Sequence, residues 1–183
     1  MTLWFEDIDS ETVWPLGEYT FTEDEIIHFA KQYDPQYFHV DPEAAKHSHF
    51  GGLIASGWHT VSVGHKVMVD FMYAHDDMQR ANGEEPGVSG PSPGVNKMEF
   101  KAPVRSGDTI RFDLKVKNKR KSNSLPGWGL LTSIISAYNE QDELVYRSEI
   151  ASFSKLRDYK PKLKERVLLA MAAMPVFRKL LRK

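Results

Sequence analysis

Residues 50–77 read FGGLIASGWHTVSVGHKVMVDFMYAHDD, and this stretch decides the fold. Glycines punctuate its start, and from Trp58 onward apolar residues recur at the three- and four-residue spacing of a helix. The apolar positions on this pattern are Val61, Val67, Met68, Phe71 and Met72. The stretch therefore predicts one long, largely buried helix. The small residues Ser62 and Gly64 within it predict that a sheet approaches the helix closely.

The spacing of the apolar residues changes on the C-terminal side of this helix. A polar segment rich in glycine and proline, residues 79–94, predicts a mobile or functional loop. Beyond it, apolar and polar residues alternate with a period of two, which is typical of half-buried strands. The strand candidates are 95–104, 109–119, 130–138 and 144–156. The layout predicts an α+β fold in which a curved antiparallel sheet packs on one central helix.

Two helix starts are visible on the N-terminal side. Thr22 and Glu25 form a capping box that opens a helix. We expect this helix to end at Asp34, because Pro35 pushes the preceding residue out of the α region. Asp41 is followed by another proline, and an aspartate at the N-cap with proline in the first turn predicts a second, short helix.

The composition bounds the class of protein. The chain has 183 residues, 41% of them apolar, which is enough for one domain with a core. Its net charge of −1 gives no sign of nucleic-acid binding. The absence of cysteine excludes disulfides, thiol nucleophiles and zinc–thiolate sites. The acidic N-terminus lacks the pattern of a secretory signal, and no apolar run approaches the roughly 20 residues of a membrane span, so we expect a cytoplasmic location.

We expect three parts along the chain. Residues 1–16 form a lead-in, residues 17–156 form the domain, and residues 157–183 form a C-terminal tail. The domain is expected to begin with a short strand over 17–21. The edges of a sheet of about five strands need cover, and pairing of two subunits edge to edge would supply it. We therefore expect a homodimer.

Positive charge is concentrated near the C-terminal end. Residues 155–183 hold ten Lys/Arg and two Asp/Glu, a net charge of +8. These cations flank an apolar stripe at helical spacing. One interpretation is a helix packed on its own dimer, or a solvated tail. The other is a basic amphipathic helix that makes weak contact with an anionic membrane surface.

The candidate chemistry begins in residues 33–41, YDPQYFHVD. Asp34 and His39 stand five residues apart in a turn-forming segment, so both side chains can face one place. Such a pair can hold a water molecule and move its proton. Burial against Tyr37 and Phe38 would tune the pKa values of both residues toward neutrality, which means upward for Asp34. The alternative is that Asp34 only caps the backbone and His39 is hydrogen-bonded at a surface.

Ala55, Ser56 and Gly57 lie where the long helix begins. The first amides of a helix have no partners inside it, and they lie at the positive end of its dipole. Glycine leaves room for a ligand atom at the backbone, so this helix start could hold a carbonyl oxygen that becomes negative during a reaction. The alternative is an ordinary cap. His47 and His49 have no visible third ligand, so we expect no metal site.

Together these residues resemble a known family. The spacing of Asp34 and His39, the segment GLIASG at 52–57 and the segment FKAPVRSGDT at 100–109 are similar to those of the MaoC-like dehydratases, which include the (R)-specific enoyl-CoA hydratases. The resemblance covers the expected domain. It implies a hot-dog fold, in which a sheet wraps a long central helix, usually as a dimer. The family pattern D-x-N-P-x-H reads D-P-Q-Y-F-H here, so Gln36 stands where asparagine is usual.

The resemblance also implies a reaction. Asp34 and His39 would hold one water that adds to C3 of a trans-2-enoyl thioester, and the Gly57 N–H would bind the thioester carbonyl; dehydration of a 3-hydroxyacyl-CoA is the reverse. The residues expected to contact substrate are Gln36, Tyr37, Phe38, Ser56 and Trp58. No cofactor is expected beyond CoA or acyl carrier protein as carrier of the acyl group. The alternatives are a hot-dog acyl-CoA thioesterase and a non-catalytic acyl-CoA-binding module.

Overall fold

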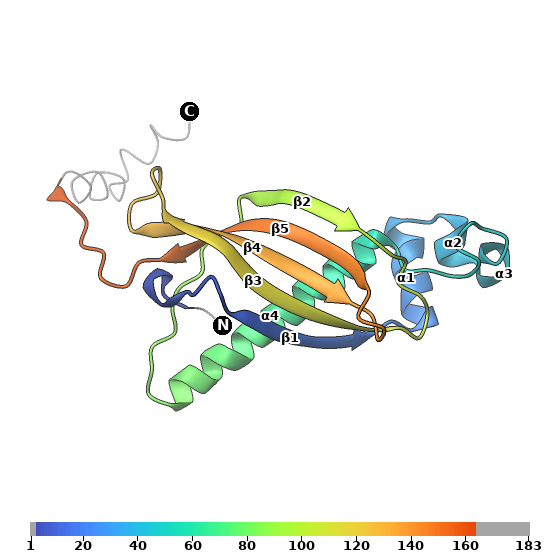
Figure 1. Ribbon diagram of the computed structural model, residues 1–183, viewed down its shortest axis with the longest axis horizontal. Coiled ribbons are helices and arrows are strands. Elements are labelled where there is room, and N and C mark those ends of the chain that lie inside the picture. The colour runs from blue at the N-terminus through green and yellow to red at the C-terminus, as the bar shows by residue number, and fades with distance from the viewer. Residues whose placement is uncertain (1–2, 164–183) are drawn as a thin grey trace, which may run out of the picture.

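A long helix and a curved sheet form the domain (Figure 1). The computed structural model describes residues 3–163. Helix α4 (Gly57–Ala81) lies across one face of a five-stranded antiparallel sheet. The fold class is α+β, and the arrangement is the predicted hot-dog fold.

The strands lie in the order β1-β3-β4-β5-β2, so β1 and β2 form the edges of the sheet. Consecutive strands β3, β4 and β5 pair with one another, and β2, which follows α4, pairs with β5. Along β4 every second residue is buried, which confirms the predicted period of two. The bounds are β1 (Val13–Thr20), β2 (Gly94–Phe100), β3 (Thr109–Lys121), β4 (Trp128–Tyr138) and β5 (Leu144–Lys155).

Both edge strands differ from their predicted bounds. β1 begins at Val13 rather than at residue 17. Pro15 and Gly17 disfavour a strand, but here they lie at a bulge on an edge strand, where a missing N–H and a φ of +135° at Gly17 are tolerated. β2 ends at Phe100, after which the chain turns toward the start of α4, and the Val104 carbonyl accepts a hydrogen bond there. The division of the chain into three parts stays a prediction.

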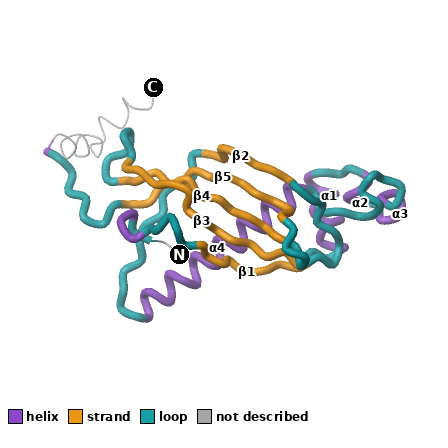
Figure 2. The backbone as a smooth tube through the Cα atoms, in the orientation of Figure 1, coloured by secondary structure: helices purple, strands orange, loops and turns teal. Residues whose placement is uncertain are grey.

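Helices α1, α2 and α3 gather at one end of the sheet (Figure 2). Thr22 caps α1 through the predicted capping box with Glu25. Asp41 caps α3, as predicted, by accepting two hydrogen bonds from backbone amides of its first turn. A short 3-10 helix lies near the N-terminus. The bounds are η1 (Phe5–Asp7), α1 (Glu23–Tyr33), α2 (Tyr37–Val40) and α3 (Pro42–Ala45).

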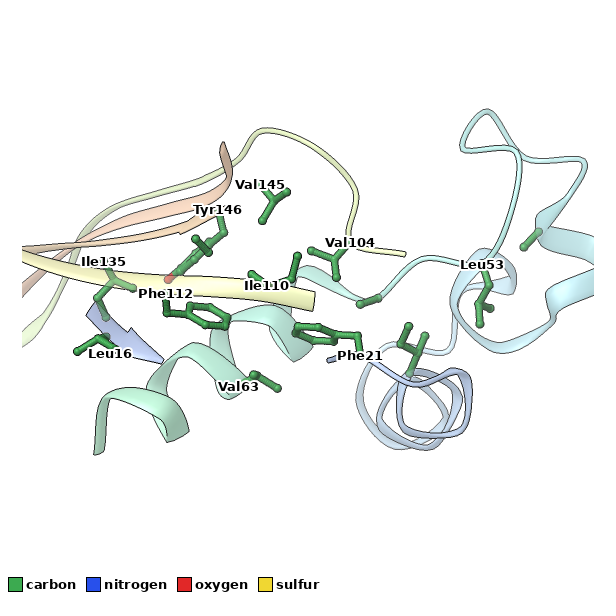
Figure 3. Packing of buried hydrophobic residues seen from close by; sticks show 14 residues of the cluster. Leu16, Phe21, Leu53, Val63, Val104, Ile110, Phe112, Ile135, Val145 and Tyr146 are labelled. Atoms are coloured by element: carbon green, nitrogen blue, oxygen red, sulfur yellow. The ribbon is translucent and has the colours of Figure 1, made fainter. Parts of the chain in front are cut away.

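Helix α4 approaches the sheet closely at Gly64. A Cβ atom at this position would lie 2.9 Å from the ring of Phe112 on β3, so the contact requires glycine. Phe112 and Phe21 are fully buried and pack with Val63 in the main core (Figure 3). The prediction of close approach is therefore confirmed at Gly64. It is wrong at Ser62, which is exposed and donates a hydrogen bond to the backbone of its own helix.

A second, smaller core lies toward the end of the sheet away from α1–α3 (Figure 1). It joins residues of the expected lead-in to the sheet. Its members are Phe5, Ile8, Val116, Leu131 and Leu156. The lead-in therefore contributes buried side chains to the interior.

The segment after α4 packs on the sheet. The helix continues to Ala81, so part of the loop predicted over 79–94 is helical. The returning chain then bonds to β5: the Gly90 N–H donates to the Phe153 carbonyl at 2.7 Å, and Ser92 Oγ donates to the Ala151 carbonyl at 2.6 Å. These contacts fasten the end of the loop beside β5.

Most of the predicted tail falls on residues 164–183, which lie outside the described residues. Its two interpretations therefore stay open. Within residues 3–163, the structure contains no helix with the length and apolar character that crossing a membrane requires.

Candidate active site

Asp34 is the residue at which α1 ends, and its N–H donates to the Ala30 carbonyl. Its side chain is 21% exposed and accepts two hydrogen bonds from other side chains. Ser56 Oγ donates to Oδ2 at 2.7 Å, and Gln36 Nε2 donates to Oδ1 at 2.9 Å. The carboxylate is thus held through both oxygens. Gln36 thus places a side-chain amide against this carboxylate.

Burial and hydrogen bonding act on the pKa of Asp34 in opposite directions. Burial raises the pKa, whereas the hydrogen bonds from Ser56 and Gln36 and the nearby His39 lower it. The lowering prevails, so the pKa of Asp34 lies below its ordinary value and the side chain is a carboxylate at neutral pH. The expected upward move is wrong, because donors that stabilise the charged form accompany the burial.

His39 lies on α2 and is 4% exposed. Its Nδ1 lies 2.8 Å from the Ile54 carbonyl oxygen. Since a carbonyl can only accept, Nδ1 carries the hydrogen and Nε2 is the nitrogen free to exchange a proton. Nε2 lies 3.5 Å from Asp34 Oδ2. The structure therefore brings Asp34 and His39 together as predicted, with two proton-accepting atoms facing each other.

The start of α4 lies beside this pair. Ser56 is its N-cap, and the Ser56 hydroxyl that donates to Asp34 also accepts from the Trp58 N–H at 3.2 Å. The amides of His59 and Thr60 donate to the Ser56 carbonyl. Within residues 3–163, the Gly57 N–H is left as the first-turn amide without a partner. A helix start that can receive an oxygen therefore lies one residue from the serine that binds Asp34.

Phe100 is a residue of this site to which the sequence reasoning assigned no role. A Cβ atom at Gly57 would lie 2.7 Å from Cζ of the Phe100 ring. The ring thus occupies the space where a side chain at Gly57 would stand, which explains the glycine. Phe100 also stacks on Tyr146, with ring centroids 5.7 Å apart. The only signal for it was its place at the start of the segment FKAPVRSGDT.

Comparison with known proteins identifies the family. The model of the MaoC like domain matches residues 11–126. The uncharacterised protein YdeM of Bacillus subtilis (strain 168) is 33% identical over 135 residues, which cover 73% of this chain and 86% of YdeM. The chain belongs to the MaoC-like domain family.

Solved structures agree with this assignment. A MaoC-like dehydratase from Rhodospirillum rubrum is 28% identical with a TM-score of 0.70, over 85% of this chain and 98% of that one. The unliganded R-hydratase PhaJ1 from Pseudomonas aeruginosa is 16% identical with a TM-score of 0.57, over 88% of this chain and 96% of that one. At that identity the second likeness is one of fold.

The other predicted residues of this MaoC-like chain differ in their surroundings. Phe38 packs against His39, with ring centroids 4.5 Å apart. Ser56 is fully buried and bonded to Asp34. Tyr37 and Trp58 are 49% and 60% exposed, so both side chains reach solvent. Their contact with substrate stays a prediction. Within the part of the chain that the structure describes, no group of three or more metal-ligating side chains occurs.

Proposed function

We propose that this protein catalyses the reversible hydration of a trans-2-enoyl thioester, which is the dehydration of a 3-hydroxyacyl thioester in reverse. One observation supports it above all. The Asp34 carboxylate and His39 Nε2 lie 3.5 Å apart beside an unpaired amide at the start of α4. Membership of the MaoC-like family supports hydration and dehydration of thioesters in general. A base pair for water and a donor for an oxyanion are the two parts that this reaction needs.

The pair is suited to hold one water. The carboxylate of Asp34 and the unprotonated Nε2 of His39 both accept hydrogen bonds, so each takes one hydrogen of the same water. The lone pairs of that water then face away from both groups, toward C3 of the substrate. The fixed hydrogen bonds of Ser56, Gln36 and the Ile54 carbonyl keep the two acceptors in place.

Proton transfer is assigned to His39. The pKa of Asp34 lies below its ordinary value, which makes it a weak base. As the water oxygen bonds to C3, its proton passes to His39 Nε2, and the Asp34 carboxylate stabilises the imidazolium. The electron pair of the double bond moves toward C2 and the thioester oxygen. His39 then returns the proton to C2, and the neutral imidazole is restored.

The negative charge that grows on the thioester oxygen would be held by the Gly57 N–H. This amide lies at the positive end of a helix of 25 residues. A fixed dipole in a partly dry site stabilises a developing charge without reorganisation. CoA or acyl carrier protein as carrier, the homodimer and the cytoplasmic location remain predictions alongside this proposal.

The test follows the enoyl-thioester absorbance during incubation with trans-2-enoyl-CoAs of increasing chain length. We expect the wild-type protein to bleach the band, and Asp34→Asn and His39→Gln to lower kcat/KM by about 10²–10⁴-fold. Asp70→Asn is the matched control, because Asp70 is an exposed carboxylate on α4 that pairs with Lys66. It should leave kcat/KM unchanged.

Three other results would overturn the proposal. Hydration that survives both site substitutions would remove the pair from the chemistry. Release of free CoA from saturated acyl-CoA without loss of the enoyl band would identify a thioesterase, and tight binding of acyl-CoA without turnover would identify a binding module.

A further inference from the structure

A cavity of about 470 Å³ lies between α4 and the sheet. It separates the main core from the second core, since its lining includes Val61 and Met68 beside the first and Val116 and Leu131 of the second. Most of its lining is apolar. A volume in this range is typical of sites that bind a small organic molecule. The interior of this domain is therefore hollow where a core is expected.

The sequence of the sheet explains the hollow. The inward positions of β4 and β5 include three serines, Ser133, Ser148 and Ser152, where β-branched or larger residues would fill a core. Ser133 and Ser148 are 5% and 2% exposed. Helix α4 packs closest to β1 and β3. The small side chains therefore leave the space over β4 and β5 empty.

The cavity begins next to the candidate active site. Val61, which lines it, lies one helical turn after Gly57. Tyr146, which also lines it, stacks on the Phe100 ring that covers Gly57. Tyr146 projects from β5 toward the space above α4 (Figure 3). The Phe100 ring thus contacts both Gly57 and a residue of the cavity lining.

The cavity is also long. Its lining follows α4 from Val61 to Met72, a distance of about 16 Å at the helical rise per residue. A long, mostly apolar space whose lining begins one helical turn after Gly57 fits an unbranched hydrocarbon chain. Each buried methylene of such a chain raises affinity about fourfold.

We propose that this cavity holds the acyl chain of a long-chain acyl thioester, which passes the Phe100 ring on its way from the Asp34–His39 pair. The proposal rests on the proposed function and adds the substrate class to it. Wild-type kcat/KM should rise from crotonyl-CoA through trans-2-octenoyl-CoA to trans-2-dodecenoyl-CoA.

The test fills the cavity and leaves the site untouched. Ser133→Leu and Ser148→Leu place a larger apolar side chain in the hollow. Both should keep or raise the melting temperature, since filling a cavity does not strain a packed core. Activity toward crotonyl-CoA should stay within about twofold, whereas activity toward dodecenoyl-CoA should fall at least about tenfold. Ser136→Leu is the control, because Ser136 alternates with the buried positions of β4 and is not part of the cavity lining.

A binding measurement separates this proposal from the proposed function. Palmitoyl-CoA cannot be hydrated, and it should raise the melting temperature of the wild-type and Ser136→Leu proteins more than acetyl-CoA does. Ser133→Leu should abolish that difference. If no enoyl-CoA is hydrated but this pattern holds, the cavity assignment stands and the reaction is wrong. If the filled variants bind palmitoyl-CoA and hydrate dodecenoyl-CoA as the wild type does, the cavity assignment is wrong.

Discussion

The first turn of α4 and its middle turns face the same sheet, yet they are built in opposite ways. At the first turn, Ser56 joins the helix start to Asp34 through a buried hydrogen bond, and glycine lets Phe100 pack against the backbone. In the middle, from Val61 to Met72, the helix faces a cavity rather than a filled core. The hydrogen bonds at the first turn fix the positions of the site residues, whereas the small side chains facing the middle turns leave an open volume. Changes at the first turn should therefore alter the rate for every substrate, and changes in the middle should alter which substrate is used.

Gly57→Ala should have the largest effect at the first turn. The added Cβ would meet three atoms of the Phe100 ring at 2.7 to 3.0 Å, so either the ring or the helix start must shift. We expect kcat/KM to fall about 10²-fold for short and long enoyl-CoAs alike, since a small displacement of the oxyanion donor is costly. Steady-state kinetics across chain lengths measure it.

The control lies five residues earlier. A Cβ at Gly52 would meet only the end of the Arg105 side chain, at 3.7 Å, so Gly52→Ala should be active. Combining Gly57→Ala with Phe100→Leu should restore part of the rate by removing ring atoms. Full activity of Gly57→Ala alone would mean that the helix start is not a fixed oxyanion site.

Ser56→Ala should have an intermediate effect. It removes the donor to Asp34 and the cap of α4 together, so the free energy of unfolding should fall by about 2 kcal/mol. The pKa of Asp34 should rise, because burial raises it and one of the hydrogen bonds that lower it has been removed. We expect kcat/KM to fall about tenfold, because the Asp34 carboxylate is no longer held by Ser56. Chemical denaturation, steady-state kinetics and an NMR titration of the Asp34 carboxyl check the three effects.

Ser62→Ala is the matched control for that substitution. Ser62 lies on the same helix, is exposed, and bonds only to the helix backbone. Removal of the Ser62 hydroxyl should change neither the free energy of unfolding nor kcat/KM. A Ser56→Ala protein in which the Asp34 carboxyl titrates as in the wild type would show that Ser56 is a cap and does not tune Asp34.

The sequence predicts what depends on neighbouring residues. The start of the long helix at Ser56 and Gly57, the capping box of Thr22 and the approach of Asp34 to His39 all follow from local rules, and the structure confirms each. It does not predict what depends on residues far apart in the chain. The contact of Phe100 with Gly57 joins the end of β2 to the start of α4, and no local pattern carries that information.

The sequence does not predict the cavity, for the same reason. Serines at alternate positions still read as strand residues, so the period of two is kept while the volume of the core changes. Whether small residues on β4 and β5 leave a hollow depends on where α4 lies. The sequence predicts a close approach at Gly64, but it does not predict that Phe112 on β3 is the residue in contact there.

Substitution of His59 should have the smallest effect of these changes. His59 differs from His39 in its hydrogen bonds, although both side chains are buried. It is 7% exposed, stacks on Phe29 with ring centroids 4.6 Å apart, and its Nδ1 has no hydrogen-bond partner among the described residues. His39 is as deeply buried, but its Nδ1 is bonded to the Ile54 carbonyl and its Nε2 faces Asp34. Burial lowers the pKa of His59 below its ordinary value, and the charge of Glu25 opposes this only in part.

His59→Phe should therefore change the dependence of stability on pH more than stability itself. Below about pH 6.5 the unfolded chain protonates this histidine and the folded chain does not, so the wild-type free energy of unfolding falls by at most about 1.4 kcal/mol per pH unit. Phenylalanine removes that loss and keeps the ring stack. Denaturation curves recorded between pH 7.5 and 5 give the free energy of unfolding at each pH. Its slope against pH should be flatter for His59→Phe than for the wild type. His47→Gln, at an exposed position, is the control and should match the wild type. Parallel slopes for the wild type and His59→Phe would mean that the folded protein protonates His59 as readily as the unfolded chain does, and that burial without a partner does not distinguish it from His39.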